Sequence, residues 1–400
     1  MKILYFGTIC DLTEYNELLS ACKCKPSVST ILFESALLTG FKQNGADMEI
    51  LSFPMIPYFP KSRCLFWGRR KERLACGYQT TWLRTINVPV LKQLSRRMDA
   101  GRALAHWCRE NRGDGVILTY SMPPFLIKEV LAYGKRYALK VVAIVPDLPR
   151  DMYINERNPS IIAAMKRRYL QATIDLQGEY DGYIYLTDAM HAVVAPGKPY
   201  TVVEGITAIP VSAHRSSGEK AFPRAVMYAG MLHRKYGIIN LLNAFGQLDD
   251  PDVELWLFGD GTAVPEIKEH AVRDQRIRFF GAVNHDTVLE YERKATLLVN
   301  PRDPDDEFTR YSFPSKIIEY MLSGTPVLAT KLAGIPEKYY AYMFSLRDNC
   351  CDNLAAAMKN ILSRPLPELE EKGRMAKDFI IREKNAYDQA GRVIEFLNEV

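Results

Sequence analysis

The chain has 400 residues, 48% of them hydrophobic and 25% charged, and its formal net charge is +5. These proportions are typical of a globular protein, and the length suggests two or three domains. No low-complexity segment is present, and no apolar run approaches the roughly 20 residues that a membrane-spanning helix needs.

The first residues, Met1 to Cys10, form a short apolar run with one lysine that is broken by Asp11. This run is too short and too poorly flanked for a signal peptide, and Lys2 to Gly7 is better interpreted as a first strand. We therefore expect a cytoplasmic protein.

From this strand onward, short apolar runs alternate with amphipathic stretches. The predicted strands are 3–6, 48–53, 115–119, 141–145, 182–186 and 201–203, and the predicted helices include 29–42, 100–108, 126–137 and 161–176. Strands that alternate with helices indicate βαβ units around a parallel sheet.

The eight cysteines do not suggest a disulfide scaffold, because the chain is neither small nor visibly secreted. Cys22 and Cys24 form a Cys-x-Cys pair, but no second pair follows at the spacing of a zinc site. We expect reduced thiols and no metal site here.

The window 61–112 is strongly basic. It holds 13 Lys or Arg against Glu72, Asp99 and Glu110, a net charge of +10, and interleaves them with Trp, Tyr and Phe. This pattern suits an anionic membrane surface or an acidic acceptor. Charge alone would also allow nucleic acid, but no nucleic-acid motif accompanies it, so we expect no nucleic-acid partner. A solvated basic face is the remaining interpretation.

A polar segment, 214–223, is interpreted as an interdomain linker. A second βαβ series follows, with predicted strands 225–228, 253–258, 277–280, 295–300, 325–329 and 343–346, and helices 237–247, 263–273 and 285–294. Two α/β sheets in one chain are expected to enclose a cleft, which is a favoured ligand site. The last predicted helix, 367–399, is long enough to break or to cross between domains.

Residues 228–237 form a predicted strand, a glycine turn and a helix start. Gly230 would let the backbone approach a phosphate closely, and Arg234 or Lys235 would neutralise it. A surface loop with unrelated charges is the alternative interpretation.

A predicted helix and strand cover residues 313–330. Pro314 suits the first helical turn and Gly324 suits the helix end. The helix start would attract anions, helped by Lys316, and Glu319 one turn later would accept hydrogen bonds from sugar hydroxyls. Lys316 and Glu319 could equally be a solvated pair on an ordinary crossover helix. Because both loops follow strands of one sheet, two cationic sites on one edge point to a nucleoside diphosphate.

Two other sequence patterns give weaker evidence of a functional site. Asp303, Asp305 and Asp306 follow a strand and could bind a divalent metal, but Pro304 and the flanking charges equally fit a charged loop. The Gly259-Asp260-Gly261 turn has Val264 where a dinucleotide fingerprint needs Gly or Ala, so NAD or FAD binding is not predicted.

Taken together, these stretches resemble the retaining glycosyltransferases of the GT-B fold, specifically the large family 4, often called group 1. The likeness covers nearly the whole chain and is strongest from 228 to 336. It is carried by 228–237, 255–261, Phe280-Gly281-Ala282-Val283 and 312–329. The resemblance implies an α/β protein with two Rossmann-like domains facing across a cleft.

The implied domains are an acceptor-binding domain, 1–212, a nucleotide-sugar-binding domain, 213–378, and a helix returning to the first domain, 379–400. The implied catalytic residue is Asp147. Residues implied to bind the donor are Gly230, Arg234, Lys235, Gly281, Ala282, Tyr311, Ser312, Phe313, Pro314, Ser315, Lys316 and Glu319.

The sequence departs from the family pattern at several of these positions. Glu319 matches the ribose-binding second Glu of the Glu-seven-residues-Glu pattern, but Tyr311 stands at the first Glu, which usually contacts the donor sugar. Met231 and Tyr236 replace the usual Arg and Lys of the phosphate loop. On the acceptor side Asp147 remains of a His-Asp pair, with Pro146 in place of the His.

The resemblance implies transfer of a sugar, with retention and without a metal or other cofactor, from a nucleotide sugar to a glycan or lipid-linked acceptor. A UDP-sugar is favoured over a GDP-sugar. The setting would be cell-surface polysaccharide or glycolipid synthesis, in the cytoplasm or peripherally on the inner membrane face. The alternatives are a nucleotide-sugar epimerase of the same fold and, because of Tyr311, a non-catalytic nucleotide-sugar-binding protein.

Overall fold

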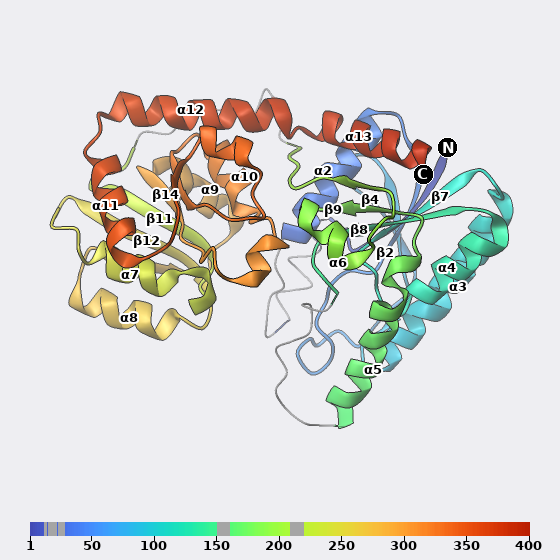
Figure 1. Cartoon of the computed structure of the whole chain (residues 1–400). Coiled ribbons are helices and arrows are strands. Elements are labelled where there is room, and N and C mark those ends of the chain that lie inside the picture. Colours follow the sequence, from blue (N-terminus) through green and yellow to red (C-terminus); the bar gives the residue numbers. More distant parts are fainter. Residues whose placement is uncertain (12–13, 15–21, 23–28, 150–160, 209–219) are drawn as a thin grey trace. The chain divides into compact units, whose positions relative to one another are not determined.

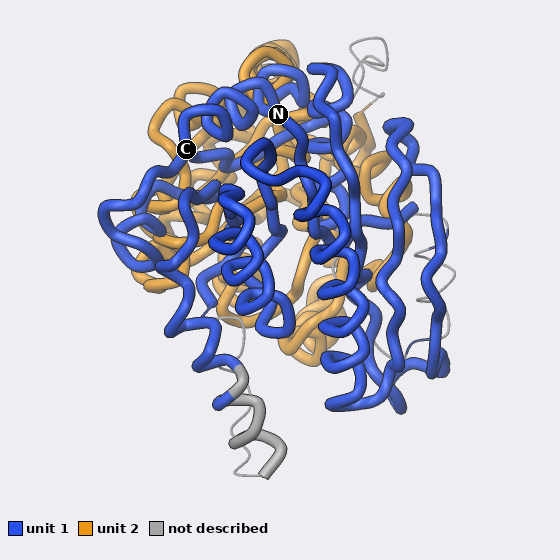
Figure 2. The backbone as a smooth tube through the Cα atoms, turned by 90° about the vertical axis from the view of Figure 1, so that its right-hand side faces the viewer, with its two compact units in different colours: residues 1–208, 385–400 blue, residues 209–384 orange. Residues whose placement is uncertain are grey.

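The computed structural model of the chain describes all residues except 12–13, 15–21, 23–28, 150–160 and 209–219. Two compact units result (Figure 2): unit 1 comprises Met1–Ala208 and Asn385–Val400, and unit 2 comprises Ile209–Lys384. The expected domain boundary after residue 212 and most of the polar segment 214–223 lie outside the described residues.

Unit 1 is built on an eight-stranded sheet in the order β10-β9-β8-β7-β1-β2-β5-β4. Neighbouring strands pair in parallel, except that β4 pairs with β5 antiparallel. The strands are β1 (Lys2–Gly7), β2 (Asp47–Ser52), β4 (Arg70–Arg73), β5 (Gln79–Trp82), β7 (Gly115–Tyr120), β8 (Lys140–Val145), β9 (Gly182–Tyr185) and β10 (Tyr200–Val202). A separate antiparallel pair joins β3 (Phe66–Trp67) to β6 (Thr85–Ile86). The six strands predicted in this half are confirmed, whereas β3 to β6 were not predicted.

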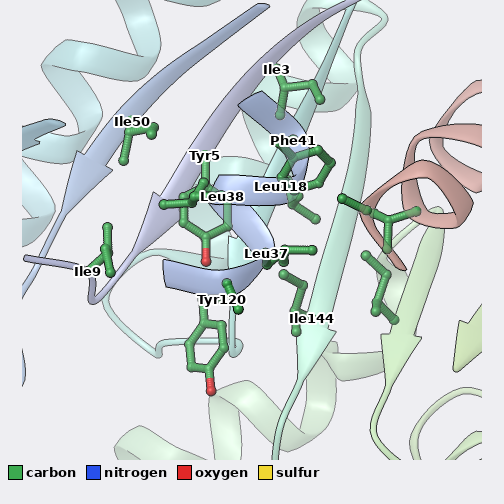
Figure 3. Close-up of a cluster of buried hydrophobic side chains, with 14 of the residues drawn as sticks. Ile3, Tyr5, Ile9, Leu37, Leu38, Phe41, Ile50, Leu118, Tyr120 and Ile144 are labelled. Atoms are coloured by element: carbon green, nitrogen blue, oxygen red, sulfur yellow. The ribbon is translucent and has the colours of Figure 1, made fainter. Parts of the chain in front are cut away.

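The helices of unit 1 are α2 (Ser29–Gln43), α3 (Leu91–Glu110), α4 (Ile127–Tyr137), α5 (Ile161–Leu176), α6 (His191–Val194) and α13 (Ala386–Glu399), with 3-10 turns η2 (Gln177–Glu179) and η3 (Asp188–Met190). One face of the sheet is covered by α2 and α13, and Figure 3 shows Tyr5 and Leu118 of the sheet beside Leu37, Leu38 and Phe41 of α2. Figure 1 shows α3 and α4 together on the other side of the sheet.

The C-terminal helix α13 is part of unit 1. Asn44 at the end of α2 donates a hydrogen bond of 2.9 Å to the carbonyl of Tyr387, and Thr207 forms a β-bridge with Asn385. Gly40 lies so close to Ala386 that a Cβ at position 40 would collide with its carbonyl. The long predicted helix 367–399 is therefore broken into two, because α12 (Leu366–Glu383) ends before Asn385 caps α13.

Unit 2 has a six-stranded, fully parallel sheet in the order β13-β12-β11-β14-β15-β16. Its strands are β11 (Arg224–Met231), β12 (Val253–Asp260), β13 (Ile277–Gly281), β14 (Leu297–Asn300), β15 (Val327–Thr330) and β16 (Phe344–Leu346). Its helices are α7 (Ile238–Phe245), α8 (Val264–Arg273), α9 (His285–Lys294), α10 (Lys316–Ser323), α11 (Cys351–Leu362) and α12, with 3-10 turns η5 (Arg234–Tyr236), η6 (Glu307–Arg310) and η7 (Glu337–Ala341). All six strands predicted in this half are confirmed.

The strand order of unit 2 reverses between β11 and β14. From this point β12 and β13 extend to one side, and β15 and β16 extend to the other. In open α/β sheets, ligands bind outside the carboxyl ends of the strands at such a switch point. The loops that begin at Leu232 and Pro301 are therefore the expected position of a ligand site.

Two expectations about the chain can be compared with the described residues. No helix among them is both long and apolar enough to cross a bilayer. None of the seven cysteines that the structure describes is in a disulfide, and Cys24 lies outside the described residues.

Candidate functional site

The loop that follows β11 is in direct contact with the loop that follows β14. Gly237 has a φ of 77°, and a Cβ there would collide with the carbonyl oxygen of Pro301. Only glycine satisfies both conditions, so this residue fixes the two loops against each other. The loop after β12 joins them, because the amide of Thr262 donates a 3.1 Å hydrogen bond to Nδ1 of His233.

Of the two cations predicted in the first loop, Arg234 is already neutralised. Its guanidinium forms an ion pair with Glu266 in the first turn of α8, although 64% of the Arg234 side chain is exposed. Arg234 can reach an anion at the switch point only by leaving this partner. The side chain of Glu266 is only 20% exposed, so this exchange would leave a largely buried carboxylate without its ion-pair partner.

The second predicted cation, Lys235, lies in an aromatic cluster with Arg302. The ammonium of Lys235 is 5.2 Å from the ring centroid of Tyr236 and 5.1 Å from that of Phe308. The guanidinium of Arg302 lies over the same two rings, at 4.7 and 5.9 Å. Cation–π contacts of this kind help to hold a charged side chain in place. Two cations are thus held at the carboxyl ends of β11 and β14, and the sequence analysis selected only one of them.

The predicted helix at Phe313 begins three residues later than expected, at Lys316 with Ser315 as its N-cap residue. Phe313 and Pro314 are buried, and the Phe313 ring packs 5.4 Å from that of Tyr339. Burial gives these two residues a packing role. Of the other predicted residues before the helix, Ser315 is exposed, and Tyr311 and Ser312 are half-buried.

A buried tyrosine fixes α10 against the end of β11. The hydroxyl of Tyr320 accepts a 2.8 Å hydrogen bond from the amide of Ala229 and donates one of 3.1 Å to its carbonyl. Tyr320 is fully buried. The start of α10 therefore has a set position beside Gly230.

Four ionisable side chains meet between α9 and α10. Nε2 of His285 lies 2.9 Å from the carboxylate of Glu319, and the ammonium of Lys316 forms an ion pair with the other oxygen of Glu319. The Lys316 ammonium is also 3.6 Å from the carboxyl of Glu292, whose side chain is completely buried. The sequence predicted Lys316 and Glu319 but neither Glu292 nor His285.

The two carboxyls in this cluster titrate in opposite directions. Burial and the neighbouring charge of Glu319 raise the pKa of Glu292 well above its usual value. Burial also acts to raise the pKa of Glu319, but the hydrogen bond with His285 and the charge of Lys316 outweigh it, and the pKa falls well below normal. Glu319 is therefore a fixed anion that can accept further hydrogen bonds from hydroxyl groups.

Lys316 serves as the counter-ion of this cluster. Burial favours its neutral amine, but the charges of Glu319 and Glu292 outweigh that effect and raise its pKa. The ammonium is thus engaged with carboxyls in this state. It is a less available anion ligand than Lys235, whose ammonium lies over the rings of Tyr236 and Phe308.

The segment 280–283 ends the outermost strand, β13. Its pairing with β12 slips by one residue, so that Phe258 pairs with Gly281 and Phe280 is left as a bulge. The ring of Phe280 stacks on Phe258 with centroids 4.4 Å apart. Gly281 follows half-buried and Ala282 is exposed. Exposed backbone therefore lies immediately before His285 and α9.

The predicted catalytic residue, Asp147, belongs to unit 1 and is exposed just after β8. Its charge contributes to a raised pKa of Tyr120, behind burial and the charge of Glu34. Glu34 is itself fully buried and accepts hydrogen bonds from Tyr5 and Thr8 at the end of β1. An acidic group of residues thus lies at the carboxyl ends of β1, β7 and β8.

The loop 303–307 has no metal-binding arrangement. Asp303 accepts a 3.0 Å hydrogen bond from the amide of Asp305, as expected for a turn. Across the described parts of the chain, no group of three or more His, Cys, Asp or Glu side chains is positioned to hold a metal ion.

Residues 223–364, which carry β11 to β16 and the cluster around Glu319, match the family model described as "Glycosyl transferases group 1". The chain carries a group 1 glycosyltransferase domain. No curated protein matches the sequence of this glycosyltransferase significantly.

Solved structures place the whole glycosyltransferase in the GT-B fold. A sucrose-phosphate synthase from Thermosynechococcus elongatus is 16% identical, with a TM-score of 0.67 over 100% of this chain and 98% of the other. Anabaena Alr3699/HepE in complex with UDP is 14% identical, with a TM-score of 0.63 over 100% of both chains. The lipopolysaccharide outer core galactosyltransferase WaaB is 11% identical, with a TM-score of 0.59 over 98% and 99%.

Three site residues of this glycosyltransferase were missed by sequence reasoning. Arg302 follows a predicted strand by two residues, and that position could have identified it, since the loops after strands carry the site. His285 opens a predicted helix directly after the segment 280–283. No feature of the sequence could have identified Glu292, because a charged residue inside a helix is normally assigned to the solvent-exposed face.

Proposed function

We propose that this glycosyltransferase binds a nucleotide sugar at the switch point of unit 2 and transfers the sugar with retention. The observation that carries the proposal is the fixed carboxylate of Glu319, held by His285 and Lys316 at the start of α10. A carboxylate with a depressed pKa suits the two hydroxyls of a ribose. The exposed backbone of Gly281 and Ala282 would bind the base.

The diphosphate would lie beside the loops that follow β11 and β14. Lys235 and Arg302 are held there by aromatic rings, and the amides near Gly230 and at the start of α10 add hydrogen-bond donors. Electrostatic stabilisation of the leaving diphosphate is the main requirement of the transfer. The side-chain cations of the chain would supply this electrostatic stabilisation, so we propose that the reaction needs no metal or other cofactor.

A UDP-sugar is the proposed donor. Support comes from structural neighbours: HepE was solved with UDP, and also with UDP and glucose, and an E. coli neighbour was bound with UDP-2-fluoro glucose. The donor's own phosphate would accept the proton of the attacking hydroxyl. Asp147 would orient the acceptor from unit 1.

We further propose that the acceptor is a glycan or a lipid-linked molecule of cell-surface polysaccharide or glycolipid synthesis. Two observations support this: the galactosyltransferase neighbour is named for lipopolysaccharide, and the window 61–112 carries a net charge of +10. That window would place the enzyme peripherally on the inner membrane face.

A thermal-shift panel with UDP-, GDP-, ADP- and CMP-sugars tests donor binding, because a ligand that binds only the native state raises the melting temperature. We expect the largest shift with a UDP-sugar, and no shift with any of them would overturn the proposal.

Tyr311 at the position of the usual Glu favours one other candidate, a non-catalytic nucleotide-sugar-binding protein. Slow hydrolysis of the stabilising nucleotide sugar would exclude it.

A further inference from the structure

The first half of helix α3 has its polar and apolar faces reversed. Lys92, Arg96 and Asp99 point inward, with at most 8% of their surface exposed. Leu91 and Leu94 face outward, exposed by 45% and 51%, as does Met98. A helix on the surface of a globular protein normally does the opposite.

The inward charges are anchored, so the reversal is built into the packing. The ammonium of Lys92 donates to the carbonyl of Ile56, and Nη2 of Arg96 donates to that of Pro54 at 2.8 Å. The carboxylate of Asp99 accepts a 3.0 Å hydrogen bond from the amide of Arg84. Rotating α3 to bury its apolar side would leave these charged side chains without hydrogen-bond partners, and the free energy of folding would become much less favourable.

The outward face of α3 continues over neighbouring segments. Phe66 of β3 is 58% exposed and pairs across the two-stranded sheet with Ile86, and the amide of Ile86 is bonded to Ser95 of α3. The amide of Phe59 bonds to the carbonyl of Asn87, next to Ile86.

Ten of the 18 exposed large hydrophobic residues in the described part of the chain lie between positions 55 and 98. We call these ten the apolar face: Met55, Tyr58, Phe59, Leu65, Phe66, Ile86, Val90, Leu91, Leu94 and Met98.

Positive charge accompanies the apolar face. Exposed basic residues in the same stretch are Lys61, Arg63, Arg69, Arg70, Lys71, Arg73, Arg84 and Arg97. Three of them already form ion pairs: Arg69 with Asp99, Arg70 with Glu14, and Arg97 with Glu129. Positions 55 to 98 contain one acidic residue, Glu72, which accepts a 2.7 Å hydrogen bond from the Trp82 indole. The next acid along the chain, Asp99, is buried. A second copy of this chain would bring the same positive charge to the contact, which disfavours self-association.

We propose that the apolar face inserts into the boundary between headgroups and acyl chains of an anionic bilayer, with the surrounding basic residues on lipid phosphates. Apolar area provides the insertion and cations select the lipid, as in interfacial helices. The inference rests on the proposed membrane contact and adds the residues and the mode of binding. Insertion differs from simple charge attraction because it survives high salt.

Flotation of the full-length protein with vesicles tests this. An apolar variant, Leu91→Ser with Leu94→Ser and Met98→Ser, keeps the charge and changes only exposed side chains. A charge variant, Arg63→Glu with Lys71→Glu and Arg73→Glu, keeps the apolar face. The matched control is Val272→Ser with Leu366→Ser and Met375→Ser, three exposed apolar residues of unit 2.

We expect the wild type and the control to float with phosphatidylglycerol vesicles and not with phosphatidylcholine vesicles. The apolar variant should bind about tenfold less at both low and high salt, and the charge variant should lose its preference for anionic lipid. Slower amide exchange at 55–66 and 86–98 on vesicles would locate the contact.

Wild-type protein that does not float, or an apolar variant that floats as the wild type does, would overturn the inference. If the wild type does not float, an acidic protein remains as the partner to test. If the apolar variant floats as the wild type does, the membrane contact is electrostatic and involves no insertion. Thermal shift with UDP is measured on every variant. A protein that binds UDP but not vesicles contradicts only the membrane inference, and one that binds vesicles but no nucleotide contradicts only the donor site.

Discussion

His285 and Glu319 are joined by a 2.9 Å contact between Nε2 and a carboxylate oxygen. His285 is the first residue of α9 and lies three positions after Ala282, which is proposed to bind the base, while Glu319 lies one turn into α10. The contact therefore sets the distance between the base-binding backbone and the carboxylate that would bind the ribose.

Replacing Glu319 with Ala should weaken binding of the nucleotide sugar by about 1.5–3 kcal/mol, the scale of a charged hydrogen bond. The fold should survive, because Lys316 keeps the carboxyl of Glu292 at 3.6 Å as a partner. Isothermal titration with UDP and with uridine should show the same loss for both. Glu290→Ala, on the exposed side of α9, is the control, and unchanged affinity in Glu319→Ala would remove this residue from the site.

Arg302→Met should weaken UDP binding by about 1.5–3 kcal/mol and leave uridine binding unchanged, because the guanidinium would contact only the diphosphate. Arg234→Met should have a smaller effect, since Arg234 is already paired with Glu266. Comparing UDP with uridine by calorimetry separates the phosphate site from the ribose site. A larger loss with Arg234→Met than with Arg302→Met would reverse the assignment.

Transfer activity should be unaffected by EDTA. The proposed diphosphate site already has Lys235 and Arg302 as cations, and Asp303 is bonded within its own turn. The assay follows sugar transfer or slow donor hydrolysis before and after chelation. Activity that EDTA abolishes and Mn²⁺ restores would instead make the loop 303–307 a metal site.

The positions of the central strands along the chain, and the loops after them, could be predicted from sequence, because apolar runs of four to eight residues identify buried parallel strands. Gly230, Lys316 and Glu319 were selected in this way. The partners of these residues could not be predicted. Whether Lys316 faces a phosphate or a second carboxyl depends on Glu292, which lies on another helix 24 positions earlier in the chain.

Helix α3 shows a second reason why sequence was insufficient. Its predicted range was 100–108, but the helix begins at Leu91. Periodicity indicates that a helix has two faces and does not indicate which one is buried. In the first half, Lys92 and Arg96 reach carbonyl groups of the loop 54–56, a tertiary contact that local pattern does not encode.

The last prediction concerns Glu34, whose carboxyl is completely buried beneath the end of β1. Burial raises its pKa to about 7, although hydrogen bonds from Thr8 and Tyr5 act in the opposite direction. An unfolded glutamate titrates near pH 4.5, so between about pH 4.5 and 7 the folded state binds more protons than the unfolded state. The free energy of unfolding should therefore fall as the pH rises through this window.

Glu34→Gln replaces the carboxyl with an uncharged group of the same shape, which resembles the protonated acid. Near pH 5 the variant and the wild type should have similar stability. By pH 8 the wild type contains a buried charge that the variant lacks, and the variant should be more stable by up to about 3 kcal/mol. Thermal unfolding of both proteins from pH 5 to pH 8 measures the difference. Glu49→Gln, an exposed carboxyl on β2, should give a curve parallel to the wild type, and a parallel curve for Glu34→Gln would show that Glu34 ionises normally in the folded protein.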